Sequence, residues 1–195
     1  MRTQLRRSLM VVAIVVLGAG GWLLTLRLGL PSAFSPELPQ NASNVRLQTT
    51  WGVPAALYDA RRSTLVFFGY TRCADACPRT LAILSRAVQE LDVERRPRIA
   101  FVDIDPWRDD PAAVQRYARR FPGVDGLCGD EPATIAAQRA LGARQVLQRN
   151  DVVNHDARVF VVDARGILLG TIAANADVDQ VRTALRSLPG RTGNG

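Results

Sequence analysis

The sequence predicts an α/β domain, with a central mixed sheet flanked by helices, behind one N-terminal transmembrane helix. Three observations predict this arrangement. Apolar runs typical of strands alternate with segments of helical periodicity, two strands around a short turn come near the end, and a long uncharged stretch precedes the whole. Helices between successive strands imply parallel crossovers, whereas a closing hairpin implies antiparallel strands, so the sheet should be mixed.

The uncharged stretch covers residues 8–26 and is about long enough to cross a bilayer core as a helix. Arg2, Arg6 and Arg7 precede it, so the positive-inside rule keeps the N-terminus in the cytoplasm and exports the rest. A cleaved signal peptide is the alternative, but the apolar run is longer than a usual signal core and lacks a clean small-x-small cleavage site. An uncleaved anchor is therefore the preferred interpretation.

The domain boundaries follow from composition. Residues 1–29 are predicted to be a cytoplasmic tip and the anchor, and residues 30–44, rich in proline, serine and asparagine, a linker. Residues 45–189 are predicted to form the single folded domain, and residues 190–195 a flexible tail.

The elements of the domain follow in order. Runs of β-branched and aromatic residues predict strands at 45–50, 55–58, 65–68, 98–104, 158–162 and 167–172, with 127–129 ambiguous. Helical periodicity predicts helices at 78–91, 111–121, 131–141 and 178–188. Asp109, Asp110 and Pro111 are expected to start the second helix, and Gly142 to end the third. This order is that of a thioredoxin-like sandwich with an inserted helix.

Composition excludes several function classes. The net charge is +7, but four arginines flank the apolar stretch and the remaining basic residues are scattered, so there is no nucleic-acid-binding footprint. Three cysteines are too few for a disulfide scaffold. The only histidine is His155, and both methionines, Met1 and Met10, lie in the leading segment. A methionine-rich copper site and a zinc site with two histidines are therefore excluded. No small-molecule substrate is expected.

Cys73 and Cys77 lie where a predicted strand hands over to a helix that has Pro78 in its first turn. The helix dipole, with Arg72 and Arg79 beside the cysteines, should favour thiolates. A four-residue offset would place both sulfurs on one face of a helical turn. The pair could be a structural disulfide, a thiol–disulfide exchange site or a metal site.

His155 precedes the strand predicted at 158–162, which in a thioredoxin-like sheet brings it beside the cysteine turn. Two thiolates and one imidazole form a soft, three-coordinate set suited to Cu(I), whereas zinc would need a fourth ligand.

Cys128, between Leu127 and Gly129, is interpreted as a buried packing residue, with a resolving thiol as the alternative.

Three further residues are expected to have structural roles. Asp103 and Asp105 end a strand at the carboxyl edge of the sheet and are expected to serve turns and caps. Trp107 is interpreted as a packing or lip residue, and the sequence says as little about the role of Trp51.

Three segments carry a resemblance to a known family: FFGYTRCADACPRTL, FVDIDPWRDDP and NHDARVFVVDARG. Residues 45–188 resemble the Sco/SenC family, membrane-anchored proteins of thioredoxin-like fold associated with assembling the binuclear copper centre of cytochrome c oxidase. Ala74 stands where the family usually has proline, and Asn154 and Asp156 flank the histidine in place of the usual aspartate and serine or threonine.

The resemblance implies that Cys73, Cys77 and His155 are copper ligands and that Cys73 and Cys77 form a reversible disulfide. Cu(I) is the favoured state and Cu(II) the alternative. The implied partner is oxidase subunit II or a similar copper acceptor. The implied location is the bacterial inner (plasma) membrane, single-pass, with the domain on the periplasmic side.

Three hypotheses remain open. The first is a metallochaperone that delivers copper. The second is an enzyme, a thiol–disulfide oxidoreductase that needs only Cys73 and Cys77 as its redox pair and acts on the cysteines of an oxidase subunit or another exported protein. The third is a structural or sensing module with an inert disulfide.

Overall fold

The computed structural model describes residues 33–37, 40–143 and 157–188. The predicted anchor, the tail and His155 lie outside these residues. Within them, no helix has the length and apolar character that a membrane span requires. The anchor at residues 8–26 therefore stays a prediction.

The described residues form one eight-stranded sheet in the order β1-β8-β7-β4-β5-β6-β2-β3. The strands are β1 (Phe34–Pro36), β2 (Arg46–Thr49), β3 (Pro54–Ala56), β4 (Thr64–Gly69), β5 (Arg98–Asp103), β6 (Val124–Cys128), β7 (Val159–Val162) and β8 (Leu168–Ile172). β5 is parallel to both β4 and β6, and the other pairs are antiparallel. The predicted mixed sheet is confirmed.

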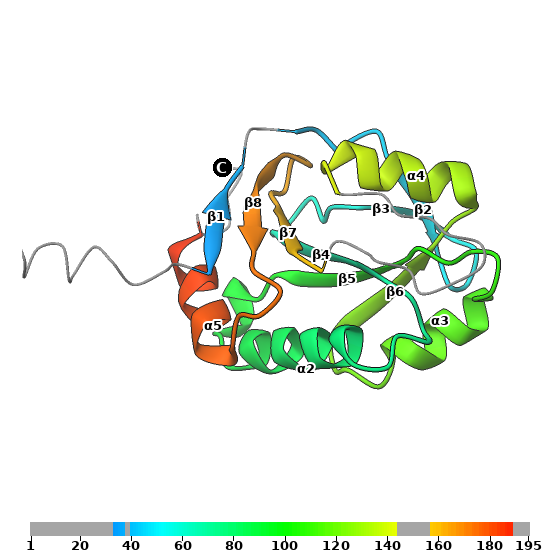
Figure 1. Ribbon diagram of the computed structural model, residues 1–195. Helices are drawn as coiled ribbons and strands as arrows, with labels where there is room; N and C mark the ends of the chain where they lie inside the picture. Colours follow the sequence, from blue (N-terminus) through cyan, green and yellow to red (C-terminus); the bar gives the residue numbers. More distant parts are fainter. Residues whose placement is uncertain (1–32, 38–39, 144–156, 189–195) are drawn as a thin grey trace, which may run out of the picture. The chain divides into compact units, whose positions relative to one another are not determined.

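Helices cover both faces of this sheet. They are α2 (Ala76–Gln89), the 3-10 turn η1 (Val93–Arg95), α3 (Pro111–Ala118), α4 (Glu131–Ala140) and α5 (Val178–Ser187). Figure 1 shows α2, α3 and α5 on one face and α4 on the other. Two apolar clusters match these layers, one against α2, α3 and α5 and the other against α4. The central strands β4 and β5 are buried on both sides, which explains their nearly continuous apolar sequence.

Local signals start α3 and α5, and end α4, where the sequence predicts. The Asp110 side chain accepts the Ala113 N–H at 2.6 Å at the start of α3. Asp177 and Gln180 form a capping box at the start of α5. Gly142 follows α4 with a φ of +64°, a backbone conformation that favours glycine at a helix end.

The structure differs from the sequence-based expectations in three places. β1 lies inside the predicted linker, 30–44, and pairs antiparallel with β8. The ambiguous segment around Leu127 is strand β6, which joins β5 to β2. α2 begins at Ala76, so Cys77 lies inside the first helical turn rather than before it.

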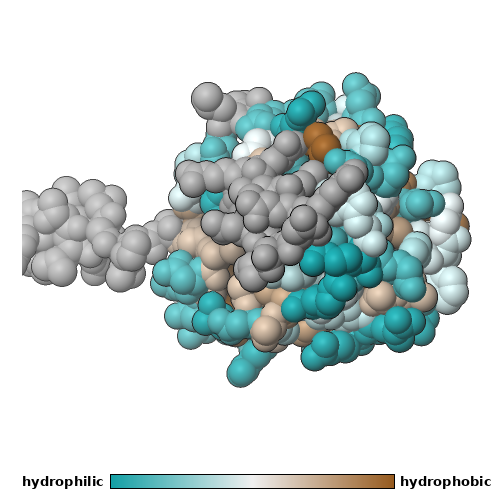
Figure 2. Space-filling model, turned by 45° about the vertical axis from the view of Figure 1, so that its right-hand side comes forward, coloured by the Kyte–Doolittle hydropathy of each residue, from teal (hydrophilic) through white to brown (hydrophobic). Residues whose placement is uncertain are grey.

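The surface shows no dominant apolar region on the face seen in Figure 2, where hydrophilic side chains prevail among the coloured residues. The exposed large apolar side chains of the described chain come from the β2–β3 turn, η1 and the loop after β5: Trp51, Val53, Val93 and Trp107. This face therefore offers no apolar patch that marks a binding site, and the functional site is sought from the chemistry of particular side chains.

Candidate metal and redox site

The cysteine pair sits at the carboxyl end of β4, where the chain turns into α2. Cys73 lies in the connecting loop and is half-buried, whereas Cys77 is the second residue of α2 and is fully buried. The Cys77 N–H donates to Cys73 Sγ at 3.3 Å, and the Cys73 N–H donates to the Tyr70 carbonyl at 3.2 Å. The sequence-based placement of both cysteines at a strand-to-helix turn is confirmed.

Gly69, the last residue of β4, lets the helix approach the strand closely. A Cβ at this position would lie 2.9 Å from Cys77 Sγ and 2.9 Å from Phe101 Cε2. Both distances are well inside normal contact distances, so any side chain here would displace the sulfur or the ring. The position of Cys77 is thus set by a glycine in the adjoining strand.

Burial changes the expected charge of the inner thiol. The pKa of Cys77 is raised by burial first, and then by a hydrogen bond with Cys73, so Cys77 is a protonated thiol at neutral pH. The expectation that Arg72 and Arg79 favour thiolates is wrong for Cys77. The Arg72 guanidinium instead binds the Asp105 carboxylate at 3.0 Å, and Arg79 is exposed.

The outer sulfur, Cys73 Sγ, receives the stabilisation that the helix start provides. It accepts an N–H of the first turn of α2, a group without an intrahelical partner. Tyr70 also lies near the sulfurs. The pKa of its hydroxyl is raised, first by burial, then by the charges of Cys73 and Cys77 and by a hydrogen bond with Cys73. Cys73 is therefore the more accessible sulfur and Cys77 the sheltered one.

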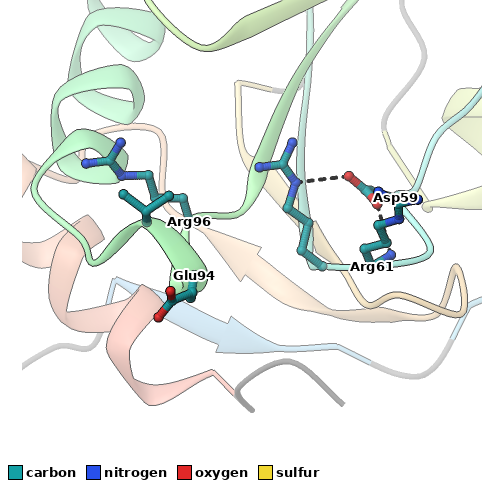
Figure 3. A pocket seen from close by; sticks show the side chains of 6 residues that line it. Asp59, Arg61, Glu94 and Arg96 are labelled. Carbon is teal, nitrogen blue, oxygen red and sulfur yellow. Dashed lines mark hydrogen bonds and ion pairs between the residues drawn. The ribbon is translucent and has the colours of Figure 1, made fainter. Parts of the chain in front are cut away.

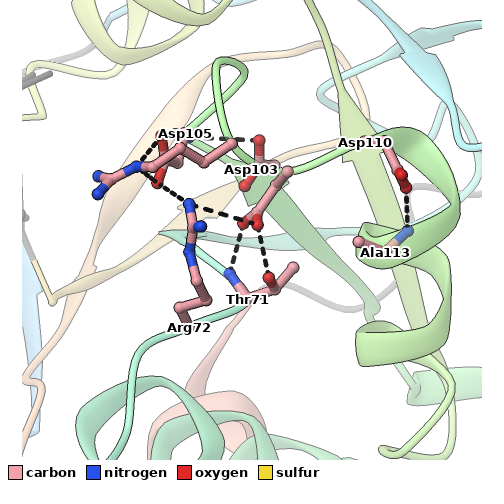
Figure 4. A network of polar contacts seen from close by, with 8 residues as sticks. Thr71, Arg72, Asp103, Asp105, Asp110 and Ala113 are labelled. Atoms are coloured by element: carbon pink, nitrogen blue, oxygen red, sulfur yellow. Dashed lines mark hydrogen bonds and ion pairs between the residues drawn. The ribbon is translucent and has the colours of Figure 1, made fainter.

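A polar network joins the cysteine loop to the loop after β5 (Figure 4). Arg72 and Arg108 both bind the buried Asp105 carboxylate, at 3.0 Å and 2.8 Å. Thr71 donates its N–H and its hydroxyl to the two carboxylate oxygens of Asp109, at 2.7 Å and 2.6 Å. Two stretches far apart in the sequence are thus tied together beside the thiols.

Sequence reasoning missed this network. The turn role assigned to Asp103 is confirmed, because its carboxylate accepts the Asp105 N–H at 3.2 Å. The burial of Asp103 and Asp105, each 1% exposed, and the two arginines bound by Asp105 were not predicted. Sequence reasoning did not single out Thr71 or Arg108, and it placed Asp109 in the cap of the following helix, whereas the Asp109 carboxylate binds Thr71. The signal was the position of the charged run directly after a buried strand, because the carboxyl ends of parallel strands share one sheet edge.

The third predicted ligand, His155, lies outside the described residues, so its place relative to the thiols stays a prediction. Among the residues that the structure does describe, no group of three cysteine, histidine or carboxylate side chains could hold a metal ion. Cys73, Cys77 and Cys128 are thiols rather than disulfides in the structure. The reversible Cys73–Cys77 disulfide is likewise a prediction.

Cys128 lies in β6, away from the cysteine loop. It is buried, its sulfur is 3.8 Å from the Gln48 carbonyl, and burial raises its pKa. These properties agree with a packing residue.

Trp51 is 70% exposed and contacts the Arg119 guanidinium, and Trp107 is 37% exposed.

A surface hollow of about 260 Å³ occupies a different part of the domain (Figure 3). Its lining comes from the segments before β4 and before β5: Asp59, Arg61, Arg62, Val93, Glu94 and Arg96. Because β4 and β5 are parallel, their starts lie at the sheet edge opposite the cysteine loop. Arg62 pairs with Asp59, and Arg96 binds the Leu91 and Gln89 carbonyls. The hollow is separate from the thiols.

Comparison with known proteins gives a consistent result. The SCO1/SenC family profile matches residues 56–189. The bovine mitochondrial SCO2 homologue is 28% identical, with 93% of this chain and 75% of the relative aligned. The human mitochondrial SCO1 homologue is 35% identical over 62% of this chain and 43% of its own length. The mouse SCO2 homologue is matched over 57% of its length, so the chain spans little more than half of that relative.

Solved structures agree on the fold. Apo Sco1 from Thermus thermophilus has a TM-score of 0.68 and 32% identity, with 80% of this chain and 96% of that one covered. Copper-bound ScoI from Bradyrhizobium japonicum has a TM-score of 0.60 and 24% identity, with 78% and 98% covered. The family profile covers both site cysteines and the described elements from β4 to α5, and this chain belongs to the SCO1/SenC family.

Proposed function

We propose that this protein binds copper through Cys73 and Cys77, with His155 as the third ligand, and delivers it during assembly of the binuclear copper centre of cytochrome c oxidase. The observation that carries the proposal is the approach of the two cysteines at the start of α2, where Cys73 Sγ in the preceding loop accepts the Cys77 N–H at 3.3 Å. A relative solved with copper bound and the family's association with oxidase assembly support it.

The donor chemistry fits Cu(I), with Cu(II) as the alternative. Thiolate sulfur is a soft ligand that selects Cu(I), and an imidazole completes a three-coordinate set. Cys77 is buried and protonated, so binding must displace its proton. Copper affinity should therefore fall as the pH falls. The half-buried Cys73 leaves one sulfur on the side from which copper can enter and leave.

Delivery requires an acceptor and a location. We propose oxidase subunit II, or a similar copper acceptor, as the partner. The predicted anchor at residues 8–26 would hold the protein in the bacterial inner membrane as a single-pass protein, with the domain on the periplasmic side. A copper centre on the same side of the membrane would then be within reach.

Copper stoichiometry tests the proposal. Purified full-length protein is reduced and loaded anaerobically with Cu(I), alongside Cys77→Ala, His155→Ala and Cys128→Ala. Wild type and Cys128→Ala should retain one equivalent of copper per chain, on the order expected for a single three-ligand site. Cys77→Ala and His155→Ala should lose most of it. Unchanged stoichiometry in His155→Ala would remove that residue from the ligand set.

The second candidate function is thiol–disulfide exchange, favoured by the combination of one accessible and one sheltered thiol. Cys73 as thiolate would attack a partner disulfide, forming a mixed disulfide and releasing one partner thiolate. The Cys77 sulfur, after losing its proton, would then attack Cys73 and release the second thiolate. Two electrons pass to the partner as Cys73 and Cys77 become a disulfide. This activity needs no imidazole, so it should survive His155→Ala.

A further inference from the structure

Two buried carboxyl groups belong to the polar network beside the cysteine loop (Figure 4). Asp103 ends β5 and is 1% exposed, and Asp109 precedes α3 and is 7% exposed. Asp103 Oδ2 accepts the Asp105 N–H at 3.2 Å, but its other oxygen, Oδ1, has no N–H or O–H donor among the described residues. Asp109 uses its carboxylate to accept both hydrogen bonds of Thr71.

A proton on Asp103 would remove the cost of leaving its buried Oδ1 without a donor. A buried carboxylate oxygen without a donor is costly, whereas a carboxylic acid can donate to a neighbouring carboxylate. Burial first, and then the charge of Asp109 and a hydrogen bond with it, raise the pKa of Asp103 to about 9. The other charged or titratable groups acting here are Arg72 of the cysteine loop, whose guanidinium lies 4.0 Å from Asp109 Oδ1, Asp105 of the loop after β5 and Cys128 of β6. At neutral pH Asp103 is therefore the donor and Asp109 the acceptor.

Asp109 in turn belongs to a set of tethers that fix the start of the cysteine loop. The Ile104 N–H donates to the Gly69 carbonyl at 2.9 Å, which ties the last residue of β4 to the segment after β5. Thr71 is bound to Asp109, and Arg72 to Asp105. The chain reaches Cys73 directly after these three contacts.

We propose that the Asp103–Asp109 pair is a positioning element for the site: the Asp103 hydroxyl holds the Asp109 carboxylate, Asp109 holds Thr71, and Thr71 fixes the backbone that carries Cys73. The effect that this pair should have on copper affinity rests on the function proposed above. Groups that orient metal ligands from outside the coordination shell typically change metal affinity by about 10- to 100-fold when removed. The pair acts through Thr71.

Substitutions at Asp103 distinguish the effect of its hydrogen-bond donor from the effect of its ionisation. Asp103→Asn keeps an N–H donor toward Asp109 that no pH change removes, whereas Asp103→Ala removes the donor. Asp110→Ala is the matched control, since Asp110 caps α3 beside Asp109 and is exposed. Loss of the Asp110 side chain destabilises α3 but leaves the hydrogen bonds between Thr71 and Asp109 in place.

Two measurements on the full-length reduced protein test the proposal. The first is Cu(I) affinity at neutral pH, by competition with a chromophoric chelator. The second is the hydrogen-exchange protection of the Thr71 amide in metal-free protein. Asp103→Ala should lower Cu(I) affinity by about 10-fold or more and lower Thr71 protection to a similar extent. Asp103→Asn and Asp110→Ala should match wild type in both.

A pH series supplies a signature that a purely structural role would not give. Wild type and Asp103→Asn should show equal Thr71 protection at neutral pH. Above about pH 9 wild type should lose protection, because an ionised Asp103 repels Asp109, and the asparagine variant should keep it. This comparison needs no copper and no disruptive variant, so it also decides the case if Asp103→Ala fails to fold.

The possible failures are distinguishable. If wild type binds no Cu(I), the proposed function is wrong, and Thr71 protection still tests the positioning role. If Asp103→Ala keeps wild-type protection and affinity, or if asparagine fails to preserve them, the positioning role is wrong whatever the copper result.

Discussion

Replacing Gly69 by alanine should disturb the core and the site together. The added Cβ would lie 2.9 Å from Cys77 Sγ, 2.9 Å from Phe101 Cε2 and 3.3 Å from Phe67 Cε1, and all three side chains are fully buried. Since ordinary contacts begin near 3.5 Å, the sulfur must move by roughly 0.6 Å or the strand must shift. Overpacking of this kind costs about 1–3 kcal/mol. For a domain of this size, that corresponds to a fall in Tm of roughly 2–12 °C.

The matched control is Gly126→Ala in β6. Its Cβ would meet Val114, Ala118 and Thr50 at 3.2–3.3 Å, contacts that are tight but include no cysteine. Urea unfolding and Cu(I) competition on both variants give the comparison. Gly69→Ala should lose stability and about 10-fold or more in Cu(I) affinity, whereas Gly126→Ala should lose stability alone. Wild-type stability in Gly69→Ala would refute the packing at the end of β4, and lost stability with unchanged affinity would refute the role of Cys77 as a ligand.

Two further predictions concern stability. Because the pKa of Asp103 is raised from 3.8 to about 9, the native state holds more protons than the unfolded state between these values, so stability should fall as pH rises through that window. Urea unfolding from pH 5 to 9 should show a flatter profile for Asp103→Asn, and parallel profiles would contradict the assignment. Asp177→Ala should cost about 1 kcal/mol by removing the capping box of α5. An unchanged unfolding midpoint would show that this helix start is not stabilised as described.

The elements that could be predicted from the sequence are those with strong local signals. The buried strands β4 and β5 are continuous apolar runs, and α3 and α5 begin at aspartates that cap them. β6 was ambiguous because Asp125 and Gly126 interrupt its apolar pattern. β1 could not be predicted, because a short, partly exposed strand with a proline exists only through its pairing with β8.

The candidate site divides in the same way. The placement of Cys73 and Cys77 followed from a strand, a break and a helix start, all of which are local features. The contact between Thr71 and Asp109 joins residues 38 positions apart, and it depends on two parallel strands ending side by side. The charge expected for Cys77 was wrong because neither its burial nor the pairing of Arg72 with Asp105 is visible in the sequence.

The central claim is that Cys73, Cys77 and His155 bind copper together. X-ray absorption at the copper edge, on full-length protein loaded with Cu(I), tests it most directly. Two sulfur ligands and one nitrogen ligand should be found, with one sulfur lost in Cys73→Ala and the nitrogen lost in His155→Ala. A first shell of nitrogen and oxygen alone, or a shell unchanged by either substitution, would contradict the claim.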